Sequence, residues 1–231
     1  HIEPMSLPGK EAMPRHAGGN FYWSQEDLVI ERAATNGWSY SVMRPQIVCG
    51  ASLGSPMNMV MAIGVYLCVM KALAQPCGFP GRSGFVTEAT DAGLLARAIL
   101  WAGQTPECAG QTFNITNGDI LHWPSLWPAL TALFGLPADE PVHRSLADEM
   151  PQHAAVWDGL VAQQNLQPYS MNAIVGSSWQ FADAVFGYAG VATTLLSTIK
   201  ARQFGFAECL DTQIMFQNQI EHLQQMRILP R

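Results

Sequence analysis

The chain has 231 residues, of which 48% are hydrophobic and 13% are charged, and its formal net charge is −6. This length and apolar content allow one sizeable core with an appended lobe. The 12 basic residues form no cluster that could neutralise phosphates, so composition and charge argue against nucleic-acid binding.

Residues 1–19 are rich in Pro and Gly and are expected to form a loop. Residues 24–27, Ser-Gln-Glu-Asp, resemble a capping box at the start of a helix that ends at Asn36-Gly37. The segments expected next are a strand at 39–48, a loop at 50–54, a helix at 55–74, a loop at 75–84, a helix from Thr90 or Asp91 to Trp101, a strand at 112–116 and a helix at 124–135. Such alternation predicts an α/β fold with a parallel sheet.

The strand signals fade from about residue 138, and four helices are expected beyond it. They cover residues 156–164, 178–187, 193–202 and 209–226. The longest apolar run of the whole chain, Met57 to Met70, is shorter than the about 18 residues of a membrane-spanning helix. We therefore expect it to be a buried core helix and expect no membrane partner.

The five cysteines are widely spaced, and neither they nor the six histidines show a metal-binding pattern. This indicates reduced, mostly buried thiols in a cytoplasmic protein, and no metal site. The chain starts at His1, without an initiator Met or a visible signal peptide. We interpret it as the C-terminal part of a longer protein.

Two motifs point to a catalytic site. Residues 20–27, Asn-Phe-Tyr-Trp-Ser-Gln-Glu-Asp, bring a tyrosine into a helix, and residues 43–50, Met-Arg-Pro-Gln-Ile-Val-Cys-Gly, end the following strand. This order is typical of the second half of a short-chain dehydrogenase/reductase site. The common form has Lys four residues after the Tyr, whereas this chain has Glu26. The pattern resembles the branch of progesterone 5β-reductase and iridoid synthase-like enone reductases.

Further blocks along the chain are similar to that family. They are residues 55–58 (Ser-Pro-Met-Asn), 113–119 (Phe-Asn-Ile-Thr-Asn-Gly-Asp), 157–158 (Trp-Asp), 175–181 (Val-Gly-Ser-Ser-Trp-Gln-Phe) and 228–230 (Ile-Leu-Pro). Two departures are Trp23, where the family has a second Tyr, and Pro56, where it has Met. No Gly-x-Gly-x-x-Gly occurs, and Gly50 and Gly54 have the wrong spacing for it.

The resemblance implies a fold: the C-terminal portion of a Rossmann-type extended short-chain dehydrogenase/reductase with a mostly helical substrate-binding lobe. Residues 1–135 would be the remainder of the Rossmann-type domain, with a substrate-lobe insertion at about 51–85. Residues 136–231 would form the helical lobe. The dinucleotide fingerprint and the catalytic Lys of this family lie before the Tyr, so both are expected outside this chain.

Tyr22 is the expected catalytic residue. A phenol is mostly neutral at pH 7, so it can donate a hydrogen bond to a substrate carbonyl that gains negative charge as hydride arrives. The alternative is a Tyr that only packs before a helix. Glu26 brings no positive charge to Tyr22, as the usual Lys would, and it could equally be a solvent-facing residue of the first helical turn.

The resemblance also assigns the cofactor, NADPH with NADH as the alternative, and the residues that contact it. These are Tyr22, Pro45, Val48, Ser55, Pro56 and Met57. Core packing for Val48 and helix capping for Ser55 are the competing interpretations. Trp179, Phe204 and Phe206, with Phe181, could line an apolar substrate pocket, although aromatic residues at such spacing are more often core.

These features together predict an NAD(P)H-dependent reductase of activated C=C bonds that acts on a small hydrophobic enone or carbonyl compound. A homodimer is compatible with the resemblance. One rival is another extended short-chain reductase or epimerase, which would need Lys after the Tyr. The other is a truncated homologue without catalysis, which the missing fingerprint favours.

Overall fold

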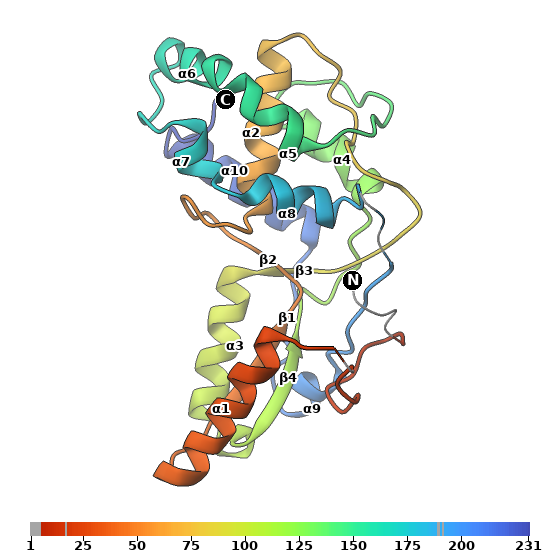
Figure 1. Ribbon diagram of the computed structural model, residues 1–231, viewed down its shortest axis with the longest axis vertical. Coiled ribbons are helices and arrows are strands. Elements are labelled where there is room, and N and C mark those ends of the chain that lie inside the picture. Colours follow the sequence, from red (N-terminus) through yellow and green to blue (C-terminus); the bar gives the residue numbers. More distant parts are fainter. Residues whose placement is uncertain (1–5, 17, 189, 191) are drawn as a thin grey trace.

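The computed structural model describes residues 6–16, 18–188, 190 and 192–231. Figure 1 shows two bodies, which meet near β2 and β3. The elements of the smaller body are α1 (Phe21–Asn36), β1 (Ser41–Pro45), α3 (Ala92–Gln104), η1 (Pro106–Cys108), β4 (Gln111–Ile115) and α9 (Ile199–Gln203). Those of the helical body are α2 (Met59–Ala72), α4 (Trp123–Ala132), α5 (Leu146–Glu149), η2 (Met150–His153), α6 (Ala154–Gln163), α7 (Met171–Val175), α8 (Ser178–Val185) and α10 (Thr212–Gln225).

The smaller body is built on a parallel strand pair. β1 lies beside β4 from Ser41 opposite Gln111 to Pro45 opposite Ile115. Helix α3 packs on this pair, and its side chains Leu94 and Ala98 join a core that includes Phe113 of β4. The alternating, parallel α/β class expected from the sequence is confirmed.

The strand expected at residues 39–48 is divided in two. β2 (Ile47–Cys49) does not continue along β4 but pairs in parallel with β3 (Ala89–Asp91), a strand that the sequence reading did not anticipate. The chain changes partner at Gln46, between β1 and β2. The single expected strand therefore contributes to two sheets, because its first half pairs with β4 and its second half pairs with β3.

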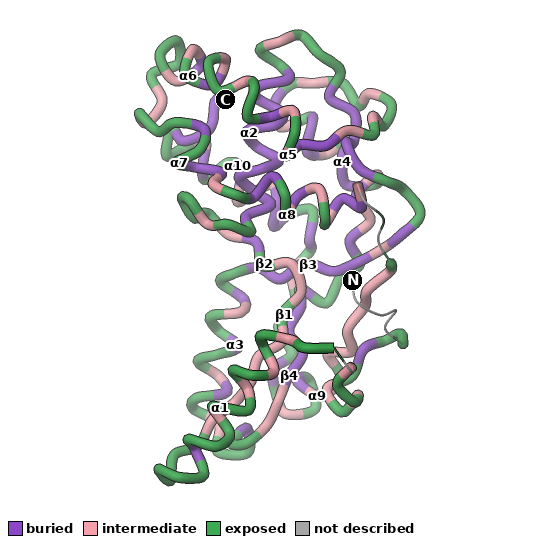
Figure 2. Tube along the Cα trace, in the orientation of Figure 1, coloured by how far each residue is buried: buried purple, intermediate pink, exposed green. Residues whose placement is uncertain are grey.

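Helix α2 is the centre of the helical body. All residues from Met59 to Met70 are buried, and α4, α6, α7, α8 and α10 surround or adjoin them in one core (Figure 2). The expectation of a buried core helix is confirmed. In the part of the chain that the structure describes, no helix is both long and apolar enough to cross a membrane.

Several expected helix ends are wrong, although the helices exist. Helix α1 starts at Phe21 with Asn20 as its cap, not at the Ser24 box, and α2 starts after Asn58, not at Ser55. Both asparagines accept a hydrogen bond from a first-turn N–H, which is why they set the start.

The helix expected at 193–202 is reduced to α9, because Leu196 instead forms a bridge with Gly9. The expected loop at 1–19 contains no helix in its described part, and residues 1–5 and 17 lie outside the described residues. The domain division near residue 135 stays a prediction. Four of the five cysteines are buried and all five are free thiols, as expected.

Candidate active site

Tyr22 projects from the first turn of α1. The Asn20 side chain accepts a hydrogen bond from the Tyr22 N–H at 2.9 Å, which fixes the start of the helix. Tyr22 is 64% exposed, and the ring of Phe21 meets its ring edge-on at 5.4 Å between centroids. Among the described residues no hydrogen bond reaches the Tyr22 hydroxyl. This hydroxyl is therefore free to donate to a ligand.

Glu26, one turn after Tyr22, is turned toward the sheet. Both of its carboxylate oxygens accept hydrogen bonds of 3.0 Å from Nη2 of Arg44 in β1. Its side chain is 12% exposed. The interpretation of Glu26 as a solvent-facing residue is therefore wrong, because an arginine on the neighbouring strand binds it. The pair also places the first turns of α1 beside the carboxyl end of β1.

The expected cofactor-binding residues follow that strand end. Pro45 closes β1, and Val48 of β2 is 38% exposed. Ser55, Pro56 and Met57 lie on the loop before α2, where Met57 is 51% exposed. All of them except the partly buried Ser55 are exposed. Their contacts with a cofactor stay a prediction.

The loop with Ser55 is held from α8. The Ser178 hydroxyl donates to the Ser55 carbonyl at 2.7 Å and accepts from the Asn58 N–H at 3.0 Å. The interpretation of Ser55 as the helix cap is wrong, since the side chain of Asn58 accepts the first-turn hydrogen bond from Met61. In the part of the chain that the structure describes, no hydrogen bond reaches the Ser55 hydroxyl, whereas the Ser55 carbonyl is already bound by Ser178.

The expected pocket aromatics belong to two different cores. Trp179 is 4% exposed in the core around α2, with Phe181 partly buried against it. Phe204 and Phe206 belong to the core of the smaller body, where Phe206 lies 5.3 Å from the ring of Trp101. The structure does not bring Trp179 together with Phe204 and Phe206. Their role as one substrate pocket stays a prediction.

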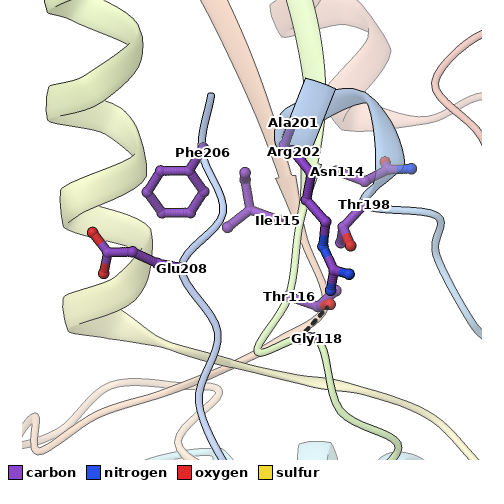
Figure 3. Close-up of a pocket in the computed structure, with 9 residues that line it drawn as sticks. All are labelled: Asn114, Ile115, Thr116, Gly118, Thr198, Ala201, Arg202, Phe206 and Glu208. Carbon is purple, nitrogen blue, oxygen red and sulfur yellow. Dashed lines mark hydrogen bonds between the residues drawn. The ribbon is translucent and has the colours of Figure 1, made fainter. Parts of the chain in front are cut away.

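Phe206 does line a small cavity at the carboxyl end of β4 (Figure 3). The cavity measures about 10 Å³ and lies between β4 and α9, with Thr116, Thr198 and Arg202 as polar neighbours. The Gly118 N–H donates to the Thr116 hydroxyl at 3.2 Å along its wall. A volume of that size holds about one water molecule, so the cavity is too small for an organic substrate.

The sequence of this chain matches one known protein family along nearly its whole length. The family model of the PRISE-like Rossmann-fold domain matches residues 4–223, which is nearly the whole chain. This chain belongs to the PRISE-like Rossmann-fold family. The resemblance and the Rossmann-type fold class stated from the sequence are confirmed.

Curated relatives agree with this assignment. The PRISE-like chain is 35% identical to (S)-8-oxocitronellyl enol synthase of Antirrhinum majus, over 99% of this chain and 59% of that protein. It is 31% identical to 3-oxo-Delta(4,5)-steroid 5-beta-reductase of Arabidopsis thaliana, over 96% of this chain and 58% of that protein. The chain therefore spans about three fifths of the length of these relatives.

Solved structures support the fold alone. UDP-glucose 4-epimerase of Thermus thermophilus in complex with NAD superposes with a TM-score of 0.58 at 15% identity, over 96% of this chain and 59% of that one. The terminal R domain of the myxalamid biosynthetic pathway superposes with a TM-score of 0.60 at 15% identity, over 98% and 56% of the two chains.

Sequence reasoning missed the role of Asn58 in this PRISE-like chain. Its Nδ2 donates to the carbonyls of Gly50 and Ser52, each at 3.0 Å, so one buried amide both shapes the loop after β2 and caps α2. The signal was present: an Asn directly before a long apolar run is a preferred helix cap. The competing Ser55-Pro56 start obscured it.

Proposed function

We propose that this chain forms part of an NAD(P)H-dependent reductase of C=C bonds conjugated to a carbonyl group. The observation that carries the proposal is Tyr22, an exposed phenol at the start of α1 in a PRISE-like chain. The names of two relatives support the chemistry. One describes reduction of a 3-oxo-Δ4,5 steroid, an enone, and the other describes formation of an enol.

Tyr22 would act on the substrate oxygen. When bound, the nicotinamide cofactor supplies hydride, and reduction at the β-carbon places negative charge on the carbonyl oxygen. A donor already in position at that oxygen stabilises the resulting enolate, and loss of such a donor costs on the order of 3 kcal/mol, a few hundredfold in rate. The α-carbon could then take its proton from water, so Tyr22 need not give up its own.

The residues of this chain fit the nicotinamide side of the cofactor. Val48 and Met57 offer exposed apolar surface after β1, and the loop of Ser55 and Pro56 follows in the same region. Open α/β sheets bind ligands at the carboxyl ends of their strands. The sequence contains no Gly-x-Gly-x-x-Gly, so the pyrophosphate would be held by another part of the complete protein. NADPH, with NADH as the alternative, is the cofactor we propose.

A small hydrophobic enone is the proposed substrate class, and a cytoplasmic location is consistent with five free thiols. An ordinary carbonyl reductase or epimerase would need a Lys four residues after Tyr22, where the Arg44-bound Glu26 stands. A non-catalytic homologue is the rival from another class, and the missing Gly-x-Gly-x-x-Gly is the observation in its favour.

The experiment compares Tyr22→Phe with the unchanged complete protein, using 2-cyclohexen-1-one and NADPH. We expect kcat to fall a few hundredfold while the Kd of NADPH stays nearly constant, since the hydroxyl acts where charge develops. Tyr169→Phe, on another exposed Tyr far along the chain, is the matched control and should retain full activity.

Product analysis distinguishes enone reduction from carbonyl reduction. The saturated ketone as main product supports enone reduction. An allylic alcohol with the alkene intact would instead assign the protein to the carbonyl reductases. Unchanged kcat in Tyr22→Phe would remove Tyr22 from the mechanism, and no turnover in the unchanged complete protein would favour the non-catalytic homologue.

A further inference from the structure

Helix α1 has little apolar contact with the rest of the protein. Among its residues, all of them described, only Ala33 is buried, near the carboxyl end (Figure 2). Trp23, Glu26 and Val29 are partly buried and, with Ala33, follow one another at intervals of three or four residues. Residues at such intervals share one helix face. A carboxylate therefore occupies the middle of the face that points inward.

The Arg44 side chain meets this carboxylate from a fixed position. Arg44 stands opposite Asn114 in the β1–β4 register, so the sheet holds its backbone. Its Nη2 binds both oxygens of Glu26, and its Nη1 reaches the Glu11 carbonyl at 3.4 Å. The two side chains are 34% and 12% exposed, so solvent screens the pair less than a fully exposed one.

Other polar and aromatic contacts of the first two turns of α1 run to the preceding loop. Arg15 pairs with Asp27 at 2.7 Å and approaches Glu26 at 3.5 Å, and the ring of His16 lies 4.1 Å from the ring of Trp23. Arg15 and His16 both lie on the loop before α1. In the first two turns of the helix, the Glu26–Arg44 pair is thus the direct polar link to the strand pair that the structure describes.

We infer that Glu26 and Arg44 are positioning residues that fix the direction of Tyr22. This inference rests on the proposed function. Glu26 lies four residues after Tyr22, which places it about 40° around the helix and about 6 Å along its axis. The Asn20 side chain accepts from the Tyr22 N–H and so holds the start of this turn, and a displacement of Glu26 would pass along the helix backbone to the phenol. A misplacement of about 1 Å at a reacting group can lower the rate about a hundredfold.

The test measures kcat and KM of the complete protein with the enone and NADPH. Glu26→Gln keeps the shape and removes the charge, so kcat should fall roughly tenfold to a hundredfold while KM changes little. Arg44→Lys keeps the charge but loses the guanidinium whose Nη2 binds both oxygens and whose Nη1 reaches the Glu11 carbonyl. Its loss of kcat should lie between that of the unchanged protein and that of Glu26→Gln. The exchange of charges in Glu26→Arg with Arg44→Glu should restore part of the lost kcat.

Two comparisons isolate the positioning role. Glu31→Gln removes the same charge from an exposed site on the same helix and should leave kcat unchanged. In a Tyr22→Phe background, Glu26→Gln should have almost no further effect on kcat, because the pair acts through Tyr22. A full effect in that background would overturn the inference and make the pair a general support of the fold.

Hydrogen exchange separates a failure of this inference from a failure of the proposed function. The amides of α1 should exchange faster in Glu26→Gln, and those of α3 should not. If α1 loosens but Tyr22→Phe itself leaves kcat unchanged, the pair holds the helix and the proposed function is wrong. If Tyr22→Phe abolishes turnover while Glu26→Gln changes neither kcat nor exchange, the proposed function stands and this inference is wrong.

Discussion

Replacing Asn117 with Ala should markedly destabilise the protein, because this side chain joins the two bodies. Asn117 is fully buried at the turn after β4. Its Oδ1 accepts the backbone N–H of Asp91 at 2.7 Å, and its Nδ2 donates to the Thr212 hydroxyl at 3.2 Å and lies 3.3 Å from the Met215 sulfur. Thr212 and Met215 belong to α10, whereas Asp91 ends β3.

The magnitude follows from the groups left behind. Loss of Oδ1 leaves the buried Asp91 N–H without a partner, which costs about 1–3 kcal/mol. Loss of the bond to Thr212 adds about 1 kcal/mol, and the void left by the amide adds to both. A total of about 3 kcal/mol would lower the Tm of a chain this long by about 6–12 °C.

The assay is urea unfolding followed by tryptophan fluorescence, with a thermal melt alongside. Asn218→Ala is the matched control, because Asn218 lies exposed on α10 and its replacement should change the free energy of unfolding by at most about 0.5 kcal/mol. A loss below about 1 kcal/mol for Asn117→Ala would refute the reasoning, since it would mean that Asp91 finds another partner at no cost.

Two further predictions concern charge and cofactor. Glu88 is buried, accepts hydrogen bonds from Leu196 and Thr116, and has a pKa raised above the usual value by burial. A raised folded-state pKa contributes stability that is complete below the unfolded pKa of about 4.3 and is lost as pH rises through the folded value. The stability of the unchanged protein relative to Glu88→Gln should therefore fall as pH rises from about 4, and a difference that is constant with pH in urea titrations would contradict this. This chain alone should bind NADPH weakly, because it lacks a glycine-rich pyrophosphate site, and micromolar affinity in a fluorescence titration would show that the phosphate side lies within it.

The sequence by itself determined features that depend on neighbouring residues. The end of α1 at Asn36-Gly37 was predicted correctly, and Gly37 adopts the left-handed conformation, with φ of 70°, that such ends use. Asp91 caps α3 by accepting the Leu94 N–H, as one of two expected caps. The buried apolar run of α2 and the family motif around Tyr22 were also readable, because composition and spacing along the chain carry both.

Only the tertiary structure decided the features that join distant residues. No local pattern predicts that the chain around Gln46 changes its pairing partner from β4 to β3. Strand pairing depends on which strand edges come together in space. Glu26 has the residue type and helix position of a solvent-facing acid, and it turns inward because Arg44, 18 residues away, reaches it. The two cores that separate Trp179 from Phe206 likewise arise from long-range packing, which spacing along the sequence does not encode.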